Sequence, residues 1–170
     1  MNFEAVVLLT RMAAEYFFRR GNGHIVQLSS VSATISFPGL AAYAGSKAGV
    51  TNLTETIRLE LRDCGVGFTV VAPGPVDTAM WSRFESEGGY ARSALNRFRL
   101  LGFLPKISPE LVAEHTVRAV ASKKPFVRIP FRYAIYHILN NAPRRLIQLA
   151  LIGVSLKPHD TTATQVIKDS

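Results

Sequence analysis

An α/β fold built on a parallel sheet is predicted, because short apolar runs alternate with longer amphipathic stretches along the 170 residues. The runs HIVQL, FTVVA and PFVRIP are rich in β-branched residues and bounded by Gly or Pro, which is typical of buried strands. Strands separated by helices pair in parallel through right-handed crossovers, so helices should cover both faces of the sheet.

The first expected helix covers residues 3–19, where apolar side chains recur at the helical spacings of four, three and four. These side chains are Ala5, Leu9, Met12 and Tyr16. Two arginines and Gly21 then supply a cationic last turn and a stop. The strand HIVQL (24–28) follows, and a loop of small residues leads from it to about residue 41.

The second expected helix runs from about Ala42 to Asp63 and ends before Gly65. Its apolar face consists of Val50, Leu53, Ile57 and Leu61. The strand FTVVA (68–72) comes next and is stopped by a Pro-Gly-Pro turn. Residues 77–106 contain Trp81 and scattered arginines, and we expect a loop or short helices that cover a site.

A further helix is expected from Pro109 to about Ser122, because Ser108 can cap its start and a proline suits the first helical position. PFVRIP (125–130) would be the third strand. The domain limits we expect are 1–130 for the α/β domain, 131–158 for a basic apolar helical extension and 159–170 for a disordered tail.

Basic residues concentrate in the C-terminal third, where eight lysines and arginines and no acid lie between His115 and His159, within a net charge of +8. The aromatic and glycine spacing of RNA-binding modules is missing, so we expect no nucleic-acid partner. The single Cys64 excludes an internal disulfide and fits a reducing, cytoplasmic compartment. The start lacks the pattern of a signal peptide, and no apolar run is long enough to span a membrane.

Two interpretations of segment 131–157 stay open. Its apolar stretch 146–156 is too short to span a bilayer but long enough to lie in an interface, and basic residues flank it. The segment then contacts a membrane peripherally, or it packs on the domain or on a neighbouring subunit with its arginines snorkelling.

Tyr43 and Lys47 stand four residues apart at the start of the second helix, so they share one helical face with small residues between them. A nearby ammonium favours the phenolate, which suits proton exchange near neutral pH. The ordinary alternative is a surface tyrosine and a solvated lysine. Ligands of such sheets bind at the carboxyl ends of the strands, where SSVSA, PGPVDT and this helix start should meet.

These motifs resemble the short-chain dehydrogenase/reductase family over about residues 2–130. Ser30 lies thirteen residues before Tyr43 and Lys47 lies four after it, as in that family. Asn2 precedes Ser30 by 28 residues, where the family has its catalytic asparagine. The resemblance implies the C-terminal half of a doubly wound Rossmann fold and an NAD(P)-dependent oxidoreductase that interconverts an alcohol and a carbonyl.

The roles that the resemblance implies make chemical sense. Tyr43 would be the acid–base, and Lys47 would favour its phenolate and bind the nicotinamide ribose. Ser30 would hold the substrate oxygen, and Asn2 would anchor a water relay to Lys47. Ser29, beside Ser30, is expected only to satisfy loop backbone.

The PGPVDT loop would complete the cofactor site together with Tyr43 and Lys47. Pro73 and Gly74 turn the chain tightly so that backbone can approach the nicotinamide, and Val76 and Thr78 would meet its carboxamide. Thr78 can equally cap the short helix that follows, and Asp77 is expected to be a solvated acid. The sequence does not select NAD or NADP, and its four dispersed histidines predict no metal.

The sequence departs from the family pattern because it has no Gly-rich GxxxGxG turn and no NAG motif. We therefore expect a truncated chain or fragment that lacks the phosphate-binding half. An alternative function is a non-catalytic fragment that acts through the helices 3–19 and 42–63, which pack against a second subunit in the family and predict a homo-oligomer.

The substrate is expected to be a lipophilic alcohol or carbonyl compound, because aromatic residues gather in the region that would cover the site. These residues are Trp81, Phe84, Phe98 and Phe103. Packing of the covering segment explains them equally well.

Overall fold

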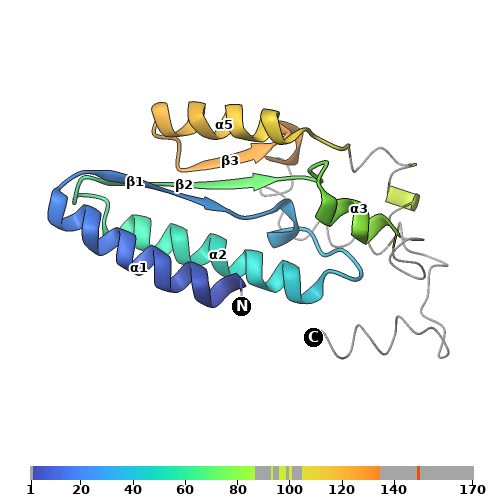
Figure 1. Ribbon diagram of the computed structural model, residues 1–170, viewed down its shortest axis with the longest axis horizontal. Helices are drawn as coiled ribbons and strands as arrows, with labels where there is room; N and C mark the ends of the chain where they lie inside the picture. The colour runs from blue at the N-terminus through green and yellow to red at the C-terminus, as the bar shows by residue number, and fades with distance from the viewer. Residues whose placement is uncertain are drawn as a thin grey trace.

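The computed structural model describes residues 2–86, 93, 96–98, 100, 105–134 and 149. In this part of the chain the strands form a three-stranded parallel sheet in the order β1-β2-β3. The strands are β1 (Gly23–Leu28), β2 (Val66–Pro73) and β3 (Phe126–Ile129). Helices α1 and α2 lie on one face of the sheet and α5 lies on the other (Figure 1). The predicted α/β class with helices on both faces is confirmed.

The helices are α1 (Asn2–Arg20), α2 (Ala41–Glu60), α3 (Ala79–Ser86) and α5 (Pro109–Ala121). Two 3₁₀ turns, Val31–Ala33 and Phe131–Ala134, follow β1 and β3. Ser108 caps α5 as predicted, its hydroxyl accepting from the Leu111 N–H at 3.2 Å. The second helix ends at Glu60, earlier than the predicted Asp63, because the chain turns towards Gly65, whose φ is 73°.

The apolar stripe that predicts α1 does not contact the sheet. Leu9, Met12 and Tyr16 are 63, 59 and 60% exposed. The buried positions are instead Thr10 and Ala14, and Phe17 packs partly buried against the same core. Thr10 also accepts a hydrogen bond from Gln27 Nε2 of β1 at 2.5 Å. The helix is therefore correct, but the side that faces the sheet carries Thr10, Ala14 and Phe17 and not the predicted stripe.

Each face of the sheet has its own core cluster, because successive side chains of a strand point to opposite faces. The cluster under α1 and α2 contains Ala14, Ile25, Val66 and Phe68. The cluster under α5 contains Val71, Ile107 and Ile129, with Val112 of α5 packed against it. β2 is nearly fully buried between the two, as expected of a central parallel strand.

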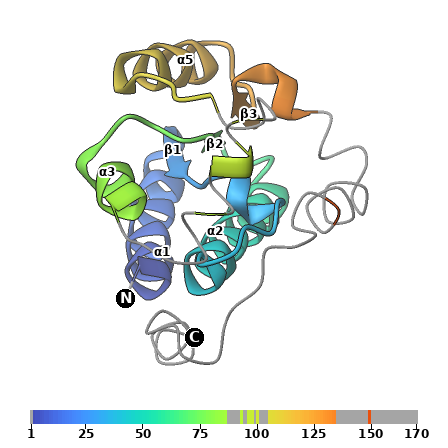
Figure 2. The same ribbon diagram turned by 90° about the vertical axis from the view of Figure 1, so that its right-hand side faces the viewer.

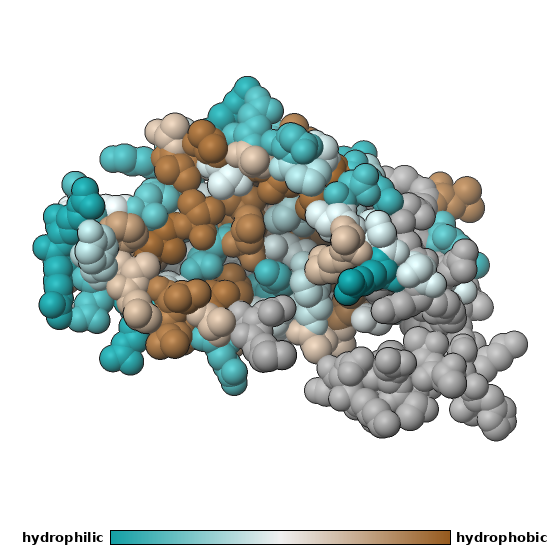
Figure 3. Space-filling view, in the orientation of Figure 1, coloured by the Kyte–Doolittle hydropathy of each residue, from teal (hydrophilic) through white to brown (hydrophobic). Residues whose placement is uncertain are grey.

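β1 lies at one edge of the described sheet, next to the apolar outer side of α1. Figure 3 views this side of the molecule and shows apolar side chains gathered over it. The exposed apolar residues of α1 are Phe3, Val7, Leu8, Leu9, Met12, Tyr16 and Phe18.

The predicted extension over 131–158 and tail over 159–170 fall almost entirely outside the described residues, as does most of 87–104. The turn Phe131–Ala134 and Leu149 are the parts of the extension that are described. Its membrane contact stays a prediction. None of the helices in the described part of the chain is long and apolar enough to cross a bilayer.

Candidate active site

The carboxyl ends of β1 and β2 and the start of α2 enclose a cavity of about 650 Å³. Figure 2 looks onto this end of the sheet, with α3 beside it. Five of the residues predicted for the site line the cavity together: Ser30, Tyr43, Pro73, Gly74 and Val76. Most of the other lining side chains are apolar: Val31, Ile35, Phe37, Leu40, Pro75, Ala79, Met80 and Trp81.

The Ser30 hydroxyl accepts one hydrogen bond and keeps a proton that it can donate. Its oxygen accepts from the Ser32 N–H at 3.1 Å, as the cap of the turn Val31–Ala33. A hydroxyl has one proton and two lone pairs, so this bond leaves the proton available. Ser30 is buried at the cavity wall and can therefore aim its proton at an oxygen atom bound there.

Tyr43 and Lys47 lie on one face of α2, as their spacing predicts. The Lys47 Nζ lies 5.8 Å from the centre of the Tyr43 ring. The same Nζ donates to the Leu28 carbonyl at 2.8 Å, which ties the lysine to the end of β1. Burial lowers the pKa of Lys47 from its ordinary value, because desolvation disfavours the ammonium. Two further ammonium protons remain for other acceptors.

Ser29 does not satisfy loop backbone with its side chain, contrary to the prediction. Its hydroxyl lies 3.0 Å from the Lys47 carbonyl oxygen of α2 and 2.6 Å from the Thr51 hydroxyl, and it can donate to either. Its backbone N–H donates to the Val71 carbonyl of β2 at 2.8 Å. Ser29 therefore connects β1, β2 and α2 next to the site.

The loop after β2 is held at the cavity by backbone hydrogen bonds to Ile107. Ile107 donates to the Pro75 carbonyl and accepts from the Asp77 N–H, both at 2.9 Å, in a parallel bridge opposite Val76. This bridge turns the N–H of Val76 itself away from Ile107. Gly74 is required here, because a Cβ atom would lie 2.6 Å from the Tyr133 ring.

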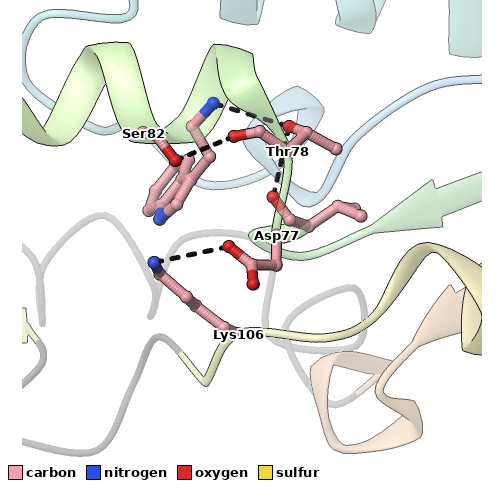
Figure 4. A network of polar contacts seen from close by, with 6 residues as sticks. Asp77, Thr78, Ser82 and Lys106 are labelled. Atoms are coloured by element: carbon pink, nitrogen blue, oxygen red, sulfur yellow. Dashed lines mark hydrogen bonds and ion pairs between the residues drawn. The ribbon is translucent and has the colours of Figure 1, made fainter.

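Thr78 and Asp77 hold the start of α3 (Figure 4). The Thr78 hydroxyl donates to the Val76 carbonyl at 3.3 Å and accepts a long bond from the Trp81 N–H at 3.5 Å. This is the capping role, and Thr78 is not among the residues that line the cavity. Asp77 is exposed but also lies 3.6 Å from Lys106 Nζ, so it is an ion-paired acid as well as a solvated one.

Asn2 is the first residue of α1, and its side chain lies outside the described residues. The same holds for the side chain of Phe84 and for Phe103. Phe98 is buried with its ring 5.2 Å from that of Phe37, so it supports the cavity wall and does not line it. Within the described ranges, His, Cys, Asp and Glu side chains form no cluster that could hold a metal ion.

Sequence reasoning missed the apolar wall contributed by the loop between β1 and α2. Ile35, Phe37 and Leu40 line the cavity, although the loop had been expected to consist of small residues. The signal was present in the sequence, because three large apolar side chains in a loop between a strand and a helix need something to pack against.

The available groups fit the nicotinamide end of a dinucleotide cofactor. Lys47 offers ammonium protons and Val76 offers a backbone N–H. These are the donors that a ribose hydroxyl and a carboxamide oxygen require.

Comparisons with known proteins identify the family and the fold. The family model of the short chain dehydrogenases matches residues 1–88. A probable oxidoreductase, EphD of Mycobacterium tuberculosis, is 32% identical over 161 residues, which cover 91% of this chain and 27% of that protein. The 3-oxoacyl-[acyl-carrier-protein] reductase FabG of Thermotoga maritima is 36% identical over 101 residues, which cover 58% of this chain and 41% of FabG.

A solved short-chain dehydrogenase from Sphingobium yanoikuyae, in complex with NADPH, has the same fold, with a TM-score of 0.65 at 20% identity. The match covers 94% of this chain and 56% of that one. The chain thus spans about a quarter to about half of the length of these relatives. It belongs to the short-chain dehydrogenase family, whose members among these relatives are oxidoreductases.

Proposed function

We propose that this chain carries the catalytic residues of an NAD(P)-dependent oxidoreductase that interconverts an alcohol and a carbonyl. The observation that supports it most is that Ser30 and Tyr43 line one cavity while Lys47 holds its ammonium 5.8 Å from the Tyr43 ring. When bound, a nicotinamide cofactor supplies or accepts the hydride. NAD and NADP are both compatible with the described residues.

Each residue has one task in this proposal. Ser30 donates its free proton to the carbonyl oxygen and stabilises the charge that develops there. Tyr43 gives its hydroxyl proton to the same oxygen during reduction and takes it back during oxidation. Lys47 places a positive charge beside Tyr43 and favours the phenolate that is left after the proton has moved. Asn2 is proposed to hold a water that resupplies the proton.

Replacement of Tyr43 tests the mechanism. Tyr43→Phe should lower kcat about 1,000-fold, within the range of lost general acid–base catalysis, because the ring stays but its proton is gone. Tyr16→Phe is the matched control, because Tyr16 is an exposed tyrosine on α1. The kcat of this variant should equal that of the wild type. Undiminished turnover of Tyr43→Phe would sink the mechanism.

A lipophilic substrate is supported by the cavity wall, where apolar side chains predominate and Arg83 is the one charged residue among the described lining residues. Trp81 lines the cavity and is the single tryptophan of the chain, so its fluorescence reports on occupancy. A long-chain ketone should change that fluorescence saturably, whereas a short hydrophilic ketone should not. Equal responses to both would contradict the proposal.

We also propose that the outer side of α1 contributes to a homo-oligomer, with α2 beside it. The support is the row of exposed apolar side chains on α1, which would be costly to leave in water. Leu9→Lys should lower the mass measured by sedimentation, whereas Glu15→Gln on the same helix should not. A monomeric wild-type protein would refute the proposed oligomer.

The same surface would also serve the alternative function, a non-catalytic fragment that binds a partner subunit through α1 and α2. Saturable binding of NADH or NADPH would favour the oxidoreductase over this alternative.

A further inference from the structure

Two hydroxyls, that of the buried Ser29 and that of the half-buried Thr51, connect the loop after β1 to the turn of α2 that carries Lys47. Ser29 is 3% exposed, and its hydroxyl lies 3.0 Å from the Lys47 carbonyl oxygen and 2.6 Å from Thr51 Oγ1. Thr51 Oγ1 in turn lies 3.1 Å from the same carbonyl oxygen. Three oxygen atoms from two segments therefore form a triangle.

The triangle can be satisfied in two ways. The two hydroxyls have one proton each, so two of the three contacts are hydrogen bonds at any moment. Either Ser29 donates to the Lys47 carbonyl and accepts from Thr51, or Thr51 donates to that carbonyl and accepts from Ser29. In both arrangements the loop is hydrogen-bonded to α2. The Lys47 carbonyl accepts a hydrogen bond from a side-chain hydroxyl in addition to its bond within the helix.

A further contact, from Lys47 to the last residue of β1, completes the connection. Lys47 Nζ donates to the Leu28 carbonyl at 2.8 Å, one residue before Ser29. The Ser29 N–H bonds Val71 of β2 at 2.8 Å, so the loop itself is anchored to the sheet. Ser30 comes next in the chain, and Tyr43 lies one turn before Lys47. The distance between the Ser30 hydroxyl and the Tyr43–Lys47 face of α2 is thus set through Ser29.

We propose that Ser29 and Thr51 are positioning residues, which hold Ser30 and the Tyr43–Lys47 pair at the separation that the reaction requires. This inference rests on the proposed oxidoreductase function. Displacing a reacting group by about 1 Å can cost about 100-fold in rate, so a modest shift of the loop should be visible in kcat. Neither residue lines the cavity, and neither is expected to contact the substrate.

The test compares Ser29→Ala and Thr51→Val with Thr54→Val. Thr54 is a matched control, because it is buried on the same helix but its hydroxyl bonds the Val50 carbonyl of its own helix at 2.7 Å. Ser29→Ala should lower kcat about tenfold and leave KM within about twofold, as expected when alignment and not binding is lost. Thr54→Val should lower the melting temperature and leave kcat within about twofold.

The double variant of Ser29→Ala and Thr51→Val should be no slower than Ser29→Ala alone, because both hydroxyls belong to one cluster. Additive losses, a loss confined to KM, or an equal loss of kcat in Thr54→Val would overturn the inference. If Tyr43→Phe is inactive but Ser29→Ala has the kcat of the wild type, the positioning role is wrong and the proposed function stands. Full activity of Tyr43→Phe would remove the proposed function itself.

A second measurement does not need turnover. The side-chain nitrogen resonance of Lys47 can be followed by NMR through a pH titration of the 170-residue chain. Burial lowers the pKa of Lys47, and release of the loop in Ser29→Ala should admit water and move that pKa back towards its ordinary value. Thr54→Val should titrate as the wild type does. Identical titrations in all three proteins would contradict the inference.

Discussion

The two ends of the sheet both carry buried polar side chains, but they use them differently. At the amino end, His24 Nε2 lies 2.8 Å from the Thr69 hydroxyl, which donates to the Lys124 carbonyl at 2.8 Å. Thr69 is 0% exposed, and its proton is used by Lys124, so it accepts from a protonated Nε2 of His24. At the carboxyl end, the Ser30 proton and the Tyr43 hydroxyl make no hydrogen bond to any described residue.

The polar groups at the amino end stabilise the fold, whereas those at the carboxyl end are available for a ligand. The amino-end network is closed, because each donor meets an acceptor from another segment, and it joins β1, β2 and the loop before β3. The carboxyl-end groups are held by their neighbours yet keep donors for a ligand in the cavity. Substitutions at the amino end should therefore change folding, and substitutions at the carboxyl end should change turnover.

Ser30→Ala should have the largest effect in this comparison. Removing one donor aimed at developing charge typically costs about 100-fold or more in kcat. The change removes only the bond from the Ser32 N–H within the described structure, so the melting temperature should move little. Steady-state kinetics and thermal melts of the same preparation check both halves of the prediction. A large loss of stability would mean that the carboxyl end is as structural as the amino end.

Thr69→Val should show the opposite behaviour. The valine keeps the shape but leaves the His24 Nε2–H and the Lys124 carbonyl without their partner, which costs about 1–3 kcal/mol in the free energy of unfolding. Turnover should be unchanged. Thr116→Val is the control, because the Thr116 hydroxyl bonds only the Val112 carbonyl of its own helix, and urea unfolding should show a smaller loss for it.

The smallest expected effect is a pH dependence of stability from His24. Burial, and then the positive charge of Lys123, lower the pKa of His24 below its ordinary value of about 6.5. Folding therefore favours the neutral ring, and the stabilisation is present above that ordinary value and is lost as the pH falls through the lowered pKa. The ring is partly exposed, so the loss should be smaller than that of Thr69→Val.

Urea unfolding at pH 8 and at pH 5 measures this effect. His24→Gln is the comparison variant, since its amide can still donate to Thr69 but does not titrate. The wild type should lose more stability than His24→Gln between the two pH values. Equal losses would assign the pH dependence to other groups.

Local patterns predicted most of the fold and part of the site. The three strands, the helices α1, α2 and α5 and the serine cap of α5 follow from apolar runs, helical periods and capping residues that act over a few neighbours. Parallel strands bring their carboxyl ends to one edge, so the loops SSVSA and PGPVDT and the start of α2 were expected to meet there. The resemblance to the family selected Ser30, Tyr43, Pro73, Gly74 and Val76 within them, and these five residues line one cavity. Local spacing also put Tyr43 and Lys47 on one face.

Only the tertiary structure decided which side of α1 is buried, where the Ser29 hydroxyl points and which loop residues form the apolar wall. α1 has apolar side chains on more than one side, so its period identifies a helix but not the side that meets the sheet. Ser29 meets Lys47 and Thr51, and Thr69 meets His24, across tens of residues of sequence. Such contacts depend on how α2, the loops and the strands pack, and no pattern within a few residues encodes that packing.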